Sequence, residues 1–481
     1  MIKDYRASTF SILTALTMVL TLLHPVYATA ASSPVSASET VLALSKVNVH
    51  QMPRIENSSL VAEAERREAS RIGVPYHFAH PFDVDLDINE TGTWEILADG
   101  STLWRLRVVS TSAKHINLGF SQFELPKGAE LWIYNAGGDH VGGPYTNDNR
   151  SKKGTLFTPV IPGDDIVIEV HVPKGAQGSL AVKVGFVNHG FRSITKPFQG
   201  ACNNDVICPE GDPWGDQISS VARFSIGGST LCTGQLINNT SLDRTPYFLS
   251  ADHCGVTTGN AHSVVVYWNY ESPVCGDLSG GSLDQNQSGA TFIASHFSSD
   301  TNLIVLDQEP LPEYGVDYGG WNVSDNIPQS SVSIHHPGGG EKAISFDEDP
   351  LTDADIGYGG NTHWEVGNWE DGTTEGGSSG SCLWDTSDGL CVGVLTGGFA
   401  SCSVISSDFY GKLSIGWEGG GTPESRLRDW LDPLDSGATS LQGLNQLSNK
   451  QEDIPTINKF GLAAMVILLA IISVFYFRLR I

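Results

Sequence analysis

Between residues 82 and 187, hydrophobic and polar positions alternate over short segments that turn signals separate. Val84, Leu86 and Ile88 share one side of the first segment. The same period of two continues through the segments 94–96, 103–108, 130–134, 166–172 and 180–187. Turn-forming pairs such as Asp99-Gly100 and Pro162-Gly163 stand between these segments. Alternation of this kind is typical of half-buried strands, and it predicts a small β-sandwich.

Three acidic residues on the first segment have the spacing with which some calcium loops begin. Asp83, Asp85 and Asp87 alternate along the chain, but Ile88 stands where an EF-hand loop needs glycine and Trp94 where it needs glutamate. An edge strand is therefore the favoured interpretation, and no metal site is expected here.

The chain on either side of this region differs in pattern. Residues 31–71 are polar, and one short amphipathic helix is expected over 60–69. From about Gly200 to Asp435, short apolar runs again alternate with glycine-rich loops, with one late helix expected over 423–431. With 481 residues the chain exceeds the ~250–300 residues that one core organises. We therefore predict a propeptide with the sandwich over 31–200 and a second all-β domain over 201–435.

The N-terminus has the three parts of a secretory signal peptide. A basic start at Lys3 and Arg6 precedes the apolar run 11–23, and Ala28-Thr29-Ala30 provides small residues for cleavage. A membrane anchor is less favoured because the run is shorter than the ~20 residues of a span. The expected signal peptide covers residues 1–30.

The C-terminus has the pattern of a membrane-spanning segment. After a polar linker over 436–458, residues 460–477 are nearly all apolar, and Arg478 and Arg480 follow them. The length suits one span, and the terminal arginines favour a cytoplasmic end. Residues 459–481 are therefore either a sorting tail that is removed after export or a permanent anchor.

Charge and cysteine content narrow the functional classes. A formal net charge of −26 argues against a nucleic-acid partner, because a polyanion would be repelled, and it would attract basic substrates. All eight cysteines lie between Cys202 and Cys402, which suggests a disulfide-linked domain in an exported protein. The spacing around Cys202 and Cys208 lacks the second C-x-x-C pair of a zinc ribbon. Neither a metal nor a cofactor is expected.

Three strings in the second domain together suggest nucleophilic catalysis. An apolar strand at 246–251 leads to His253, Asp300 opens the apolar run 301–306, and Ser379 lies in the string Gly376-Gly377-Ser378-Ser379-Gly380. A serine hydroxyl attacks only when a neutral imidazole accepts its proton, and a carboxylate on the other ring nitrogen orients that imidazole. The glycine-rich turn would direct the N–H groups of Gly377 and Ser379 at the oxyanion, each worth about 3–4 kcal/mol.

Each string alone is more often structural than catalytic. A His-Cys pair is commonly part of a core, a Gly/Ser-rich string is commonly a plain loop, and single acids precede many strands. The order His253, Asp300, Ser379, however, is that of chymotrypsin-type proteases, and the first two residues lie next to strands. We therefore predict that these three residues form a catalytic triad.

The second domain resembles bacterial lysyl endopeptidases, which belong to the chymotrypsin-like superfamily. The resemblance covers essentially all of 201–435, and the first domain is similar to the prosegment of these enzymes. The matching strings are Cys202–Gly211, Cys232–Gly234, Val266–Tyr270, His335–Pro337, Thr374–Ser381, Ser401–Ser403, Ser407–Gly411 and Trp430–Pro433.

The resemblance implies an all-β fold of two six-stranded antiparallel barrels with the active site in the cleft between them. It also implies three disulfides, which carry over as Cys202–Cys402, Cys208–Cys275 and Cys232–Cys254. Cys382 and Cys391 remain. They flank a short hairpin and form either a fourth bridge, which needs a Cα separation under about 7 Å, or two buried thiols.

Primary specificity is less closely defined than catalysis. The position six residues before the nucleophile, where trypsin-like enzymes carry their pocket acid, is Thr373. In lysyl endopeptidases the pocket acid comes later in the chain, in the string Ser-Asp-x-Tyr-Gly, and the resemblance places it at Asp408 here. A carboxylate in a narrow pocket favours the compact ammonium of lysine. The family histidine before Gly397 and Gly398 is replaced by Thr396. Asp408 is therefore either the lysine reader or a residue of an ordinary solvated loop.

Further expectations concern the rest of the family pattern. The resemblance implies that Tyr358 replaces a stacked tryptophan of the family. Ser378 stands where chymotrypsin relatives have an aspartate that pairs with a new N-terminus, so activation by that ion pair is not expected. His335 and His336 are adjacent on a strand and point to opposite faces, which favours a structural role or a place in a substrate-binding loop over a metal pair.

The sequence thus predicts an exported serine endopeptidase, secreted or on the bacterial cell surface, that acts on protein or peptide substrates, with lysine as the preferred residue. Its own prodomain is the expected partner, as an intramolecular inhibitor or folding aid, and the C-terminal segment would contact a membrane before processing. The alternatives are a serine protease of other primary specificity and a non-catalytic surface binding or adhesion module on a protease scaffold.

Overall fold

The computed structural model describes residues 33–69, 72–194 and 200–446. The predicted signal peptide and the predicted C-terminal membrane segment lie outside these ranges. Within them, no helix combines the length and the apolar character that crossing a membrane requires.

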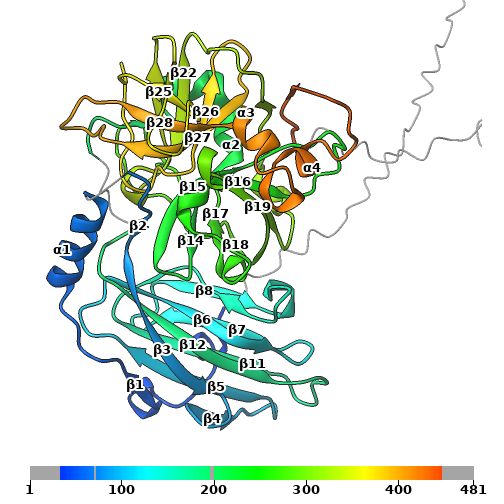
Figure 1. Cartoon of the computed structure of the whole chain (residues 1–481). Coiled ribbons are helices and arrows are strands. Elements are labelled where there is room, and N and C mark those ends of the chain that lie inside the picture. The colour runs from blue at the N-terminus through cyan, green and yellow to red at the C-terminus, as the bar shows by residue number, and fades with distance from the viewer. Residues whose placement is uncertain (1–32, 70–71, 195–199, 447–481) are drawn as a thin grey trace, which may run out of the picture.

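The N-terminal part is a β-sandwich of two sheets (Figure 1). One sheet has the order β1 (Val49–Gln51), β5 (Thr102–Val109), β11 (Asp165–Val172), β7 (Glu130–Asn135) and β8 (Val141–Tyr145), with β4 (Thr93–Ile96) on β5. The other has the order β10 (Ile161–Pro162), β6 (His115–Glu124), β12 (Ala181–Gly190) and β3 (Ala79–Asp87), with β9 (Leu156–Phe157) on β6. Alternating apolar side chains of both sheets, such as Leu106, Phe120 and Ile168, form one core.

The C-terminal part contains two further, largely antiparallel sheets, which carry the predicted site. The first has the order β18 (Asn286–Ser288), β17 (Val265–Tyr267), β14 (Val221–Ile226), β15 (Thr230–Leu236), β16 (Tyr247–Ala251), β20 (Thr301–Leu306) and β19 (Ala290–His296). The second has the order β13 (Asn204–Asp205), β23 (Ala343–Asp347), β22 (Ser331–His335), β26 (Cys382–Asp385), β27 (Cys391–Gly398), β28 (Asp408–Lys412), β25 (His363–Val366) and β24 (Thr352–Ala354). The short strands β21 (Trp321–Asn322) and β29 (Ser440–Leu441) extend this sheet beside β27.

A short strand links the two parts. β2 (Tyr76–His77) precedes the sandwich strand β3 but pairs antiparallel with β15, placing Tyr76 opposite Leu231 and His77 opposite Thr230. In Figure 1 it lies where the sandwich meets the upper sheets. The prosegment-like part therefore contributes a strand to the sheet next to the predicted site.

The helices are short and peripheral. α1 (Asn57–Glu68) matches the predicted amphipathic helix, and α2 (Gly215–Ser220) and α3 (Leu413–Glu418) border the upper sheets. The late helix expected over 423–431 is instead a 3₁₀ turn at Pro423–Ser425 and one short helix, α4 (Arg428–Leu431). Pro423 fits only at the start of a helix, and Arg426, with ψ 150°, interrupts the helical conformation.

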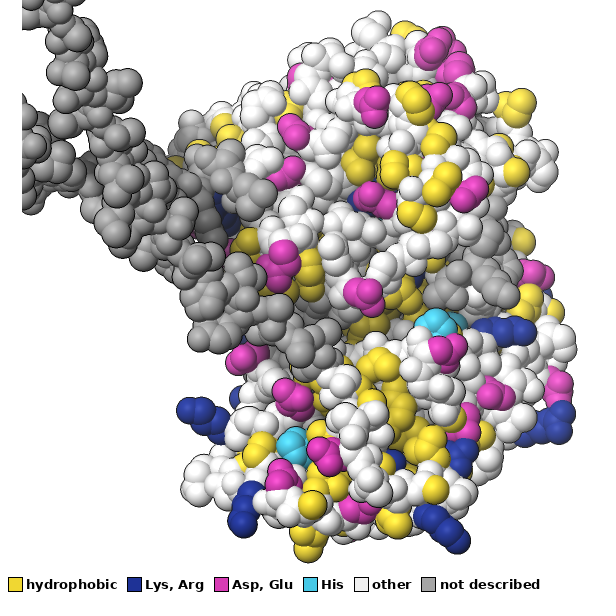
Figure 2. Space-filling model, turned by 180° about the vertical axis from the view of Figure 1, so that it is seen from behind, with side chains coloured by type: hydrophobic (Ala, Val, Ile, Leu, Met, Phe, Trp, Pro, Cys, Tyr) yellow, Lys and Arg dark blue, Asp and Glu magenta, His cyan; other side chains and the backbone are white. Residues whose placement is uncertain are grey.

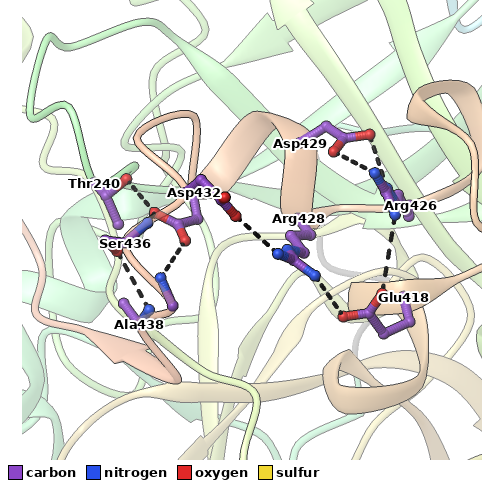
Figure 3. A network of polar contacts seen from close by, with 10 residues as sticks. Thr240, Glu418, Arg426, Arg428, Asp429, Asp432, Ser436 and Ala438 are labelled. Carbon is purple, nitrogen blue, oxygen red and sulfur yellow. Dashed lines mark hydrogen bonds and ion pairs between the residues drawn. The ribbon is translucent and has the colours of Figure 1, made fainter.

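Polar contacts fix α4 against the rest of the domain (Figure 3). The carboxylate of Asp432 accepts hydrogen bonds from the Thr240 hydroxyl at 2.8 Å and from Ser436 Oγ at 2.7 Å. Arg428 bridges Glu418 of α3 and Asp435. The C-terminal end of the domain is thereby tied to the loop that follows β15.

Four disulfides link all eight cysteines. They are Cys202–Cys402, Cys208–Cys275, Cys232–Cys254 and Cys382–Cys391. The last pair has a Cα separation of 5.6 Å, so the open alternative of two buried thiols is wrong.

Candidate active site

His253 and Asp300 meet because their strands are neighbours. β16 and β20 pair antiparallel with Ala251 opposite Thr301, so the turn after β16 faces the residue before β20. His253 Nδ1 lies 2.7 Å from Asp300 Oδ2, and the His253 backbone N–H donates to Asp300 Oδ1 at 2.8 Å. Asp300 is buried and has a φ of +49°, which turns its carboxylate back toward the ring. The ring is thus held from one side by a carboxylate.

Ser379 lies in the loop between β25 and β26 and is fixed through its backbone. Its carbonyl accepts a hydrogen bond from Thr233 N–H of β15 at 2.8 Å, and Gly380 N–H donates to Leu395 O of β27 at 2.8 Å. The loop thus joins the two upper sheets. Cys254, bridged to Cys232 and next to His253 in the chain, lies with its sulfur 3.9 Å from Ser379 O.

The three side chains do not yet form a continuous hydrogen-bonded chain. Within the described residues, His253 Nε2 is buried and has no hydrogen-bond partner, so the Ser379 hydroxyl is not bonded to it. Ser379 itself is 8% exposed. The structure therefore pairs His253 with Asp300, while a hydrogen bond from the Ser379 hydroxyl to His253 Nε2 stays a prediction.

The backbone around Ser379 presents free donors. Among the described residues, no backbone hydrogen bond uses the N–H of Gly377 or of Ser379. Gly377 has a φ of +99°, and a Cβ there would lie 2.7 Å from Gly339 N, so only glycine fits. Two unused N–H groups, separated by Ser378 in the turn that carries the Ser379 hydroxyl, are the kind of donor pair that an oxyanion requires.

His335 supports this loop through a contact with Ser378 that the sequence did not reveal. Its Nδ1 lies 2.8 Å from Ser378 Oγ, and its Nε2 lies 3.0 Å from Ser345 Oγ. Burial lowers the pKa of His335 to about 3, so the ring is neutral at ordinary pH. Ser378, in the position before the nucleophile, is thus held by a neutral ring. His336 binds Gly340 O through Nδ1 instead, consistent with a structural role for both histidines.

Asp408 is fully buried beside the predicted substrate-binding strand. Its Oδ2 accepts hydrogen bonds from Trp369 Nε1 at 2.8 Å and from Thr374 Oγ1 at 2.6 Å. Its Oδ1 is buried and has no partner at normal hydrogen-bond geometry among the described residues, although the Ala400 backbone N–H is near enough to favour the charged carboxylate and so opposes the rise in the Asp408 pKa. A Cβ on Gly398 would lie 2.2 Å from Oδ1, so this oxygen lies directly against the glycine backbone. Burial raises the pKa of Asp408, and the solvated-loop alternative is wrong.

The neighbouring Thr373, predicted as a substrate-binding residue at the position of the trypsin-type acid, is buried and bonds only within the protein. Its hydroxyl donates to Thr374 O at 3.4 Å, and its carbonyl accepts from Ser345 Oγ at 3.0 Å. Thr374, one residue later, binds Asp408. Sequence reasoning missed Thr374 and Trp369 because the contacts join positions 34 and 39 residues apart.

Metal chemistry finds no support in the side-chain clusters of the described ranges. The one group of three potential ligands there is Cys232, His253 and Cys254. Both cysteines belong to one disulfide, so neither sulfur is a thiolate that could bind a metal ion.

Comparison with known proteins gives the family. Residues 43–191 match the model "Lysyl endopeptidase N-terminal domain", and residues 198–411 match "Lysyl endopeptidase, C-terminal domain". A lysyl endopeptidase of Pseudomonas aeruginosa is 28% identical over 377 residues, which are 72% of this chain and 79% of that protein. The chain belongs to the lysyl endopeptidase family. It is a serine endopeptidase of the chymotrypsin-like fold, with the sandwich as the family's N-terminal domain.

Solved structures that are similar to this chain include two proteases. A Glu endopeptidase matches 40% of this chain and 86% of its own, with 17% identity and a TM-score of 0.28. The protease Anisep from Arthrobacter nicotinovorans matches 40% of this chain and 90% of its own, with 16% identity and a TM-score of 0.30.

The chain differs from the lysyl endopeptidase pattern at Thr396, and the structure places a histidine from another strand there. Thr396 Oγ1 lies 3.0 Å from Nε2 of His363 in β25. The His363 ring packs on Tyr358 with centroids 5.4 Å apart, and Tyr358 packs on Phe297 at 4.8 Å. Burial lowers the pKa of His363 to about 4, although the charge of Asp300 opposes this shift. A histidine–aromatic pair thus lies beside the Asp300 side of the site.

Proposed function

We propose that this chain is an exported endopeptidase that cleaves peptide bonds after lysine through an acyl-enzyme. In this proposal His253, Asp300 and Ser379 are the catalytic triad, the N–H groups of Gly377 and Ser379 bind the oxyanion, and Asp408 recognises the lysine ammonium. Thr396, Gly397 and Gly398 line the path of the substrate backbone toward the pocket.

The observation that carries the lysine preference is the unpartnered Oδ1 of Asp408. A fully buried carboxylate oxygen without a donor is costly unless a ligand supplies one. It lies against Gly398, at the end of β27, where even a Cβ would come within 2.2 Å of it, so recognition of lysine requires a narrow path to this oxygen. An ammonium on a four-carbon stem fits this requirement better than the planar, forked guanidinium of arginine.

The proposed chemistry uses the chain's own groups throughout. Ser379 Oγ bonds to the carbonyl carbon while its proton passes to His253 Nε2, and Asp300 stabilises the resulting imidazolium. The carbonyl oxygen takes the negative charge between the two free N–H groups. The C–N bond then breaks as the imidazolium gives its proton to the leaving amine. Water repeats the sequence on the ester and releases the acid.

Export and a basic substrate are supported by covalent structure and charge. The four disulfides suit an oxidising compartment. Residues 200–446 contain 33 acidic and six basic residues, a difference of 27, so this part accounts for the whole net charge. On the face seen in Figure 2, acidic side chains spread over the upper part, and most visible lysines and arginines lie lower. Such a field raises the encounter rate of cationic substrates.

A labelling and cleavage assay tests the proposal. A fluorophosphonate should modify Ser379 in processed enzyme, and Ser379→Ala should abolish both labelling and peptide hydrolysis, whereas Ser387→Ala, an exposed loop serine, should leave both unchanged. A peptide library should yield cuts after lysine. Full activity in Ser379→Ala would refute the mechanism, cuts after other residues would refute the specificity, and an inert wild-type enzyme would favour a binding module.

A further inference from the structure

The segment 72–77, called the cleft segment below, lies between α1 and the sandwich strand β3 in the chain and contacts the candidate active site. Its last two residues form β2 and pair with β15, the strand that also holds the Ser379 backbone through Thr233. Figure 1 shows β2 at the junction, close to the upper sheets. The cleft segment is thus in contact with the protease part while still connected to the sandwich.

The first residues of the cleft segment contact the histidine side of the site. A Cβ on Gly73 would lie 3.5 Å from Cγ of His253 and 3.4 Å from the Tyr358 hydroxyl. A Cβ on Gly397 would lie 3.3 Å from Cγ2 of Ile72. Ile72 and Gly73 therefore lie between the catalytic imidazole and the strand that leads to Asp408.

The last residues contact the oxyanion side. A Cβ on Gly376 would lie 3.2 Å from Cδ2 of Tyr76, so the Tyr76 ring covers the residue next to Gly377. Val74 and Pro75 connect Gly73 at His253 to Tyr76 at Gly376. They therefore span the catalytic centre.

The cleft segment also runs in the direction of a substrate. The residue before a cleaved bond must lie toward Asp408, because its side chain enters that pocket, and the leaving part must lie on the other side. The cleft segment begins with Ile72 at Gly397, on the Asp408 side, and ends with Tyr76 and His77 at β15, on the leaving side. From this we infer that the cleft segment is an internal inhibitor that presents the Val74–Pro75 bond to Ser379. The inference rests on the proposed function.

Three features explain why an enzyme so occupied would not cut itself. Val74 lacks an ammonium for Asp408. Pro75 supplies a ring nitrogen without an N–H in the leaving position, and its fixed φ restricts the backbone there. Gly73 has a φ of +74°, a bend that departs from the extended backbone of a bound peptide.

The sandwich fastens the cleft segment through Arg192. The guanidinium forms two hydrogen bonds with the carboxylate of Glu68 at 2.7 and 3.1 Å, and it donates to His77 O at 3.1 Å. It also lies 4.6 Å from the centre of the Tyr76 ring. A buried cation thus ties the end of α1, the cleft segment and the end of β12 together, so occupancy of the cleft depends on the folded sandwich.

A strained glycine substitution in the full chain tests the inhibition. Gly73→Val places a branched side chain at positive φ and against His253, and it should raise the rate of fluorophosphonate labelling of the unprocessed chain about tenfold. Gly175→Val is the matched control, because Gly175 has a φ of +73° and no atom within 4 Å of its Cβ position. It should label like the wild type. The label is counted by mass spectrometry only on chains of full-length mass, so that enzyme already freed from its N-terminal part does not contribute.

A second variant tests the register. Val74→Lys with Pro75→Ala should turn the cleft segment into a substrate, giving a new N-terminus at residue 75 by mass spectrometry. Val74→Lys alone keeps proline and should stay uncut, as should the double variant with Ser379→Ala. An uncut double variant that hydrolyses added lysyl peptides, or equal labelling of wild type and Gly73→Val, would overturn the inhibitor. Absence of labelling in every chain, processed enzyme included, would instead overturn the proposed protease function.

Discussion

Replacing Asp408 by asparagine isolates the proposed lysine reader, because the change keeps the shape and removes the charge. The asparagine oxygen can still accept the bonds from Trp369 and Thr374, which places its amide N–H donors where Oδ1 stood. The lysine ammonium would then meet donors instead of an acceptor. Losing one member of a buried charge pair costs about 2–5 kcal/mol, and the reversed hydrogen-bonding role places the expected loss at about 4 kcal/mol, or about a thousandfold.

The assay compares two substrates that differ only in the residue before the cleaved bond, lysine or the uncharged norleucine. In processed enzyme, with active sites counted by fluorophosphonate, kcat/KM for lysine should fall about a thousandfold in Asp408→Asn. The value for norleucine should stay within about threefold. Glu365→Gln is the control, since Glu365 pairs with Phe409 in the adjacent strand and loses a charge outside the pocket. An unchanged lysine-to-norleucine ratio in Asp408→Asn would refute Asp408 as the reader.

Three further predictions follow from the same geometry. Gly398→Ala should lower kcat/KM for lysyl substrates at least about a hundredfold, because the new Cβ would lie 2.2 Å from Asp408 Oδ1. Gly367→Ala, which has open space around its Cβ, should leave kcat/KM unchanged, and equal losses in the two variants would contradict the prediction. The unfolded chain binds a proton at His335 near pH 6.5 that the folded chain binds only near pH 3, so unfolding measured in urea should become easier as pH falls below 6.5. The slope for this one residue is about 1.4 kcal/mol per pH unit, and it should be missing in His335→Gln. Raising NaCl from about 50 to 500 mM should reduce kcat/KM for a polycationic peptide several-fold and leave a neutral peptide carrying one lysine nearly unchanged; equal changes would refute steering by the acidic surface.

The sequence predicted most of what depends on local pattern. Alternation located the sandwich strands, and the strings around His253, Asp300 and Ser379 lie where neighbouring strands converge. Contacts between distant side chains stayed hidden, because a single sequence carries no signal for them. His335 supports Ser378 over 43 residues, and β2 pairs with a strand more than 150 residues later. β2 also has only two residues after a proline, too few for a periodic pattern.

The covalent link between the cleft segment and the catalytic part fixes how inhibition responds to dilution. A tethered ligand competes at a local concentration that its linker sets, often in the millimolar range, whatever the amount of protein in solution. Diluting the intact chain would therefore release no activity. Once the backbone is cut between the sandwich and Gly200, the same contacts become bimolecular, and spreading into a large extracellular volume would itself drive the sandwich away. A single hydrolytic event would thus make activity depend on volume.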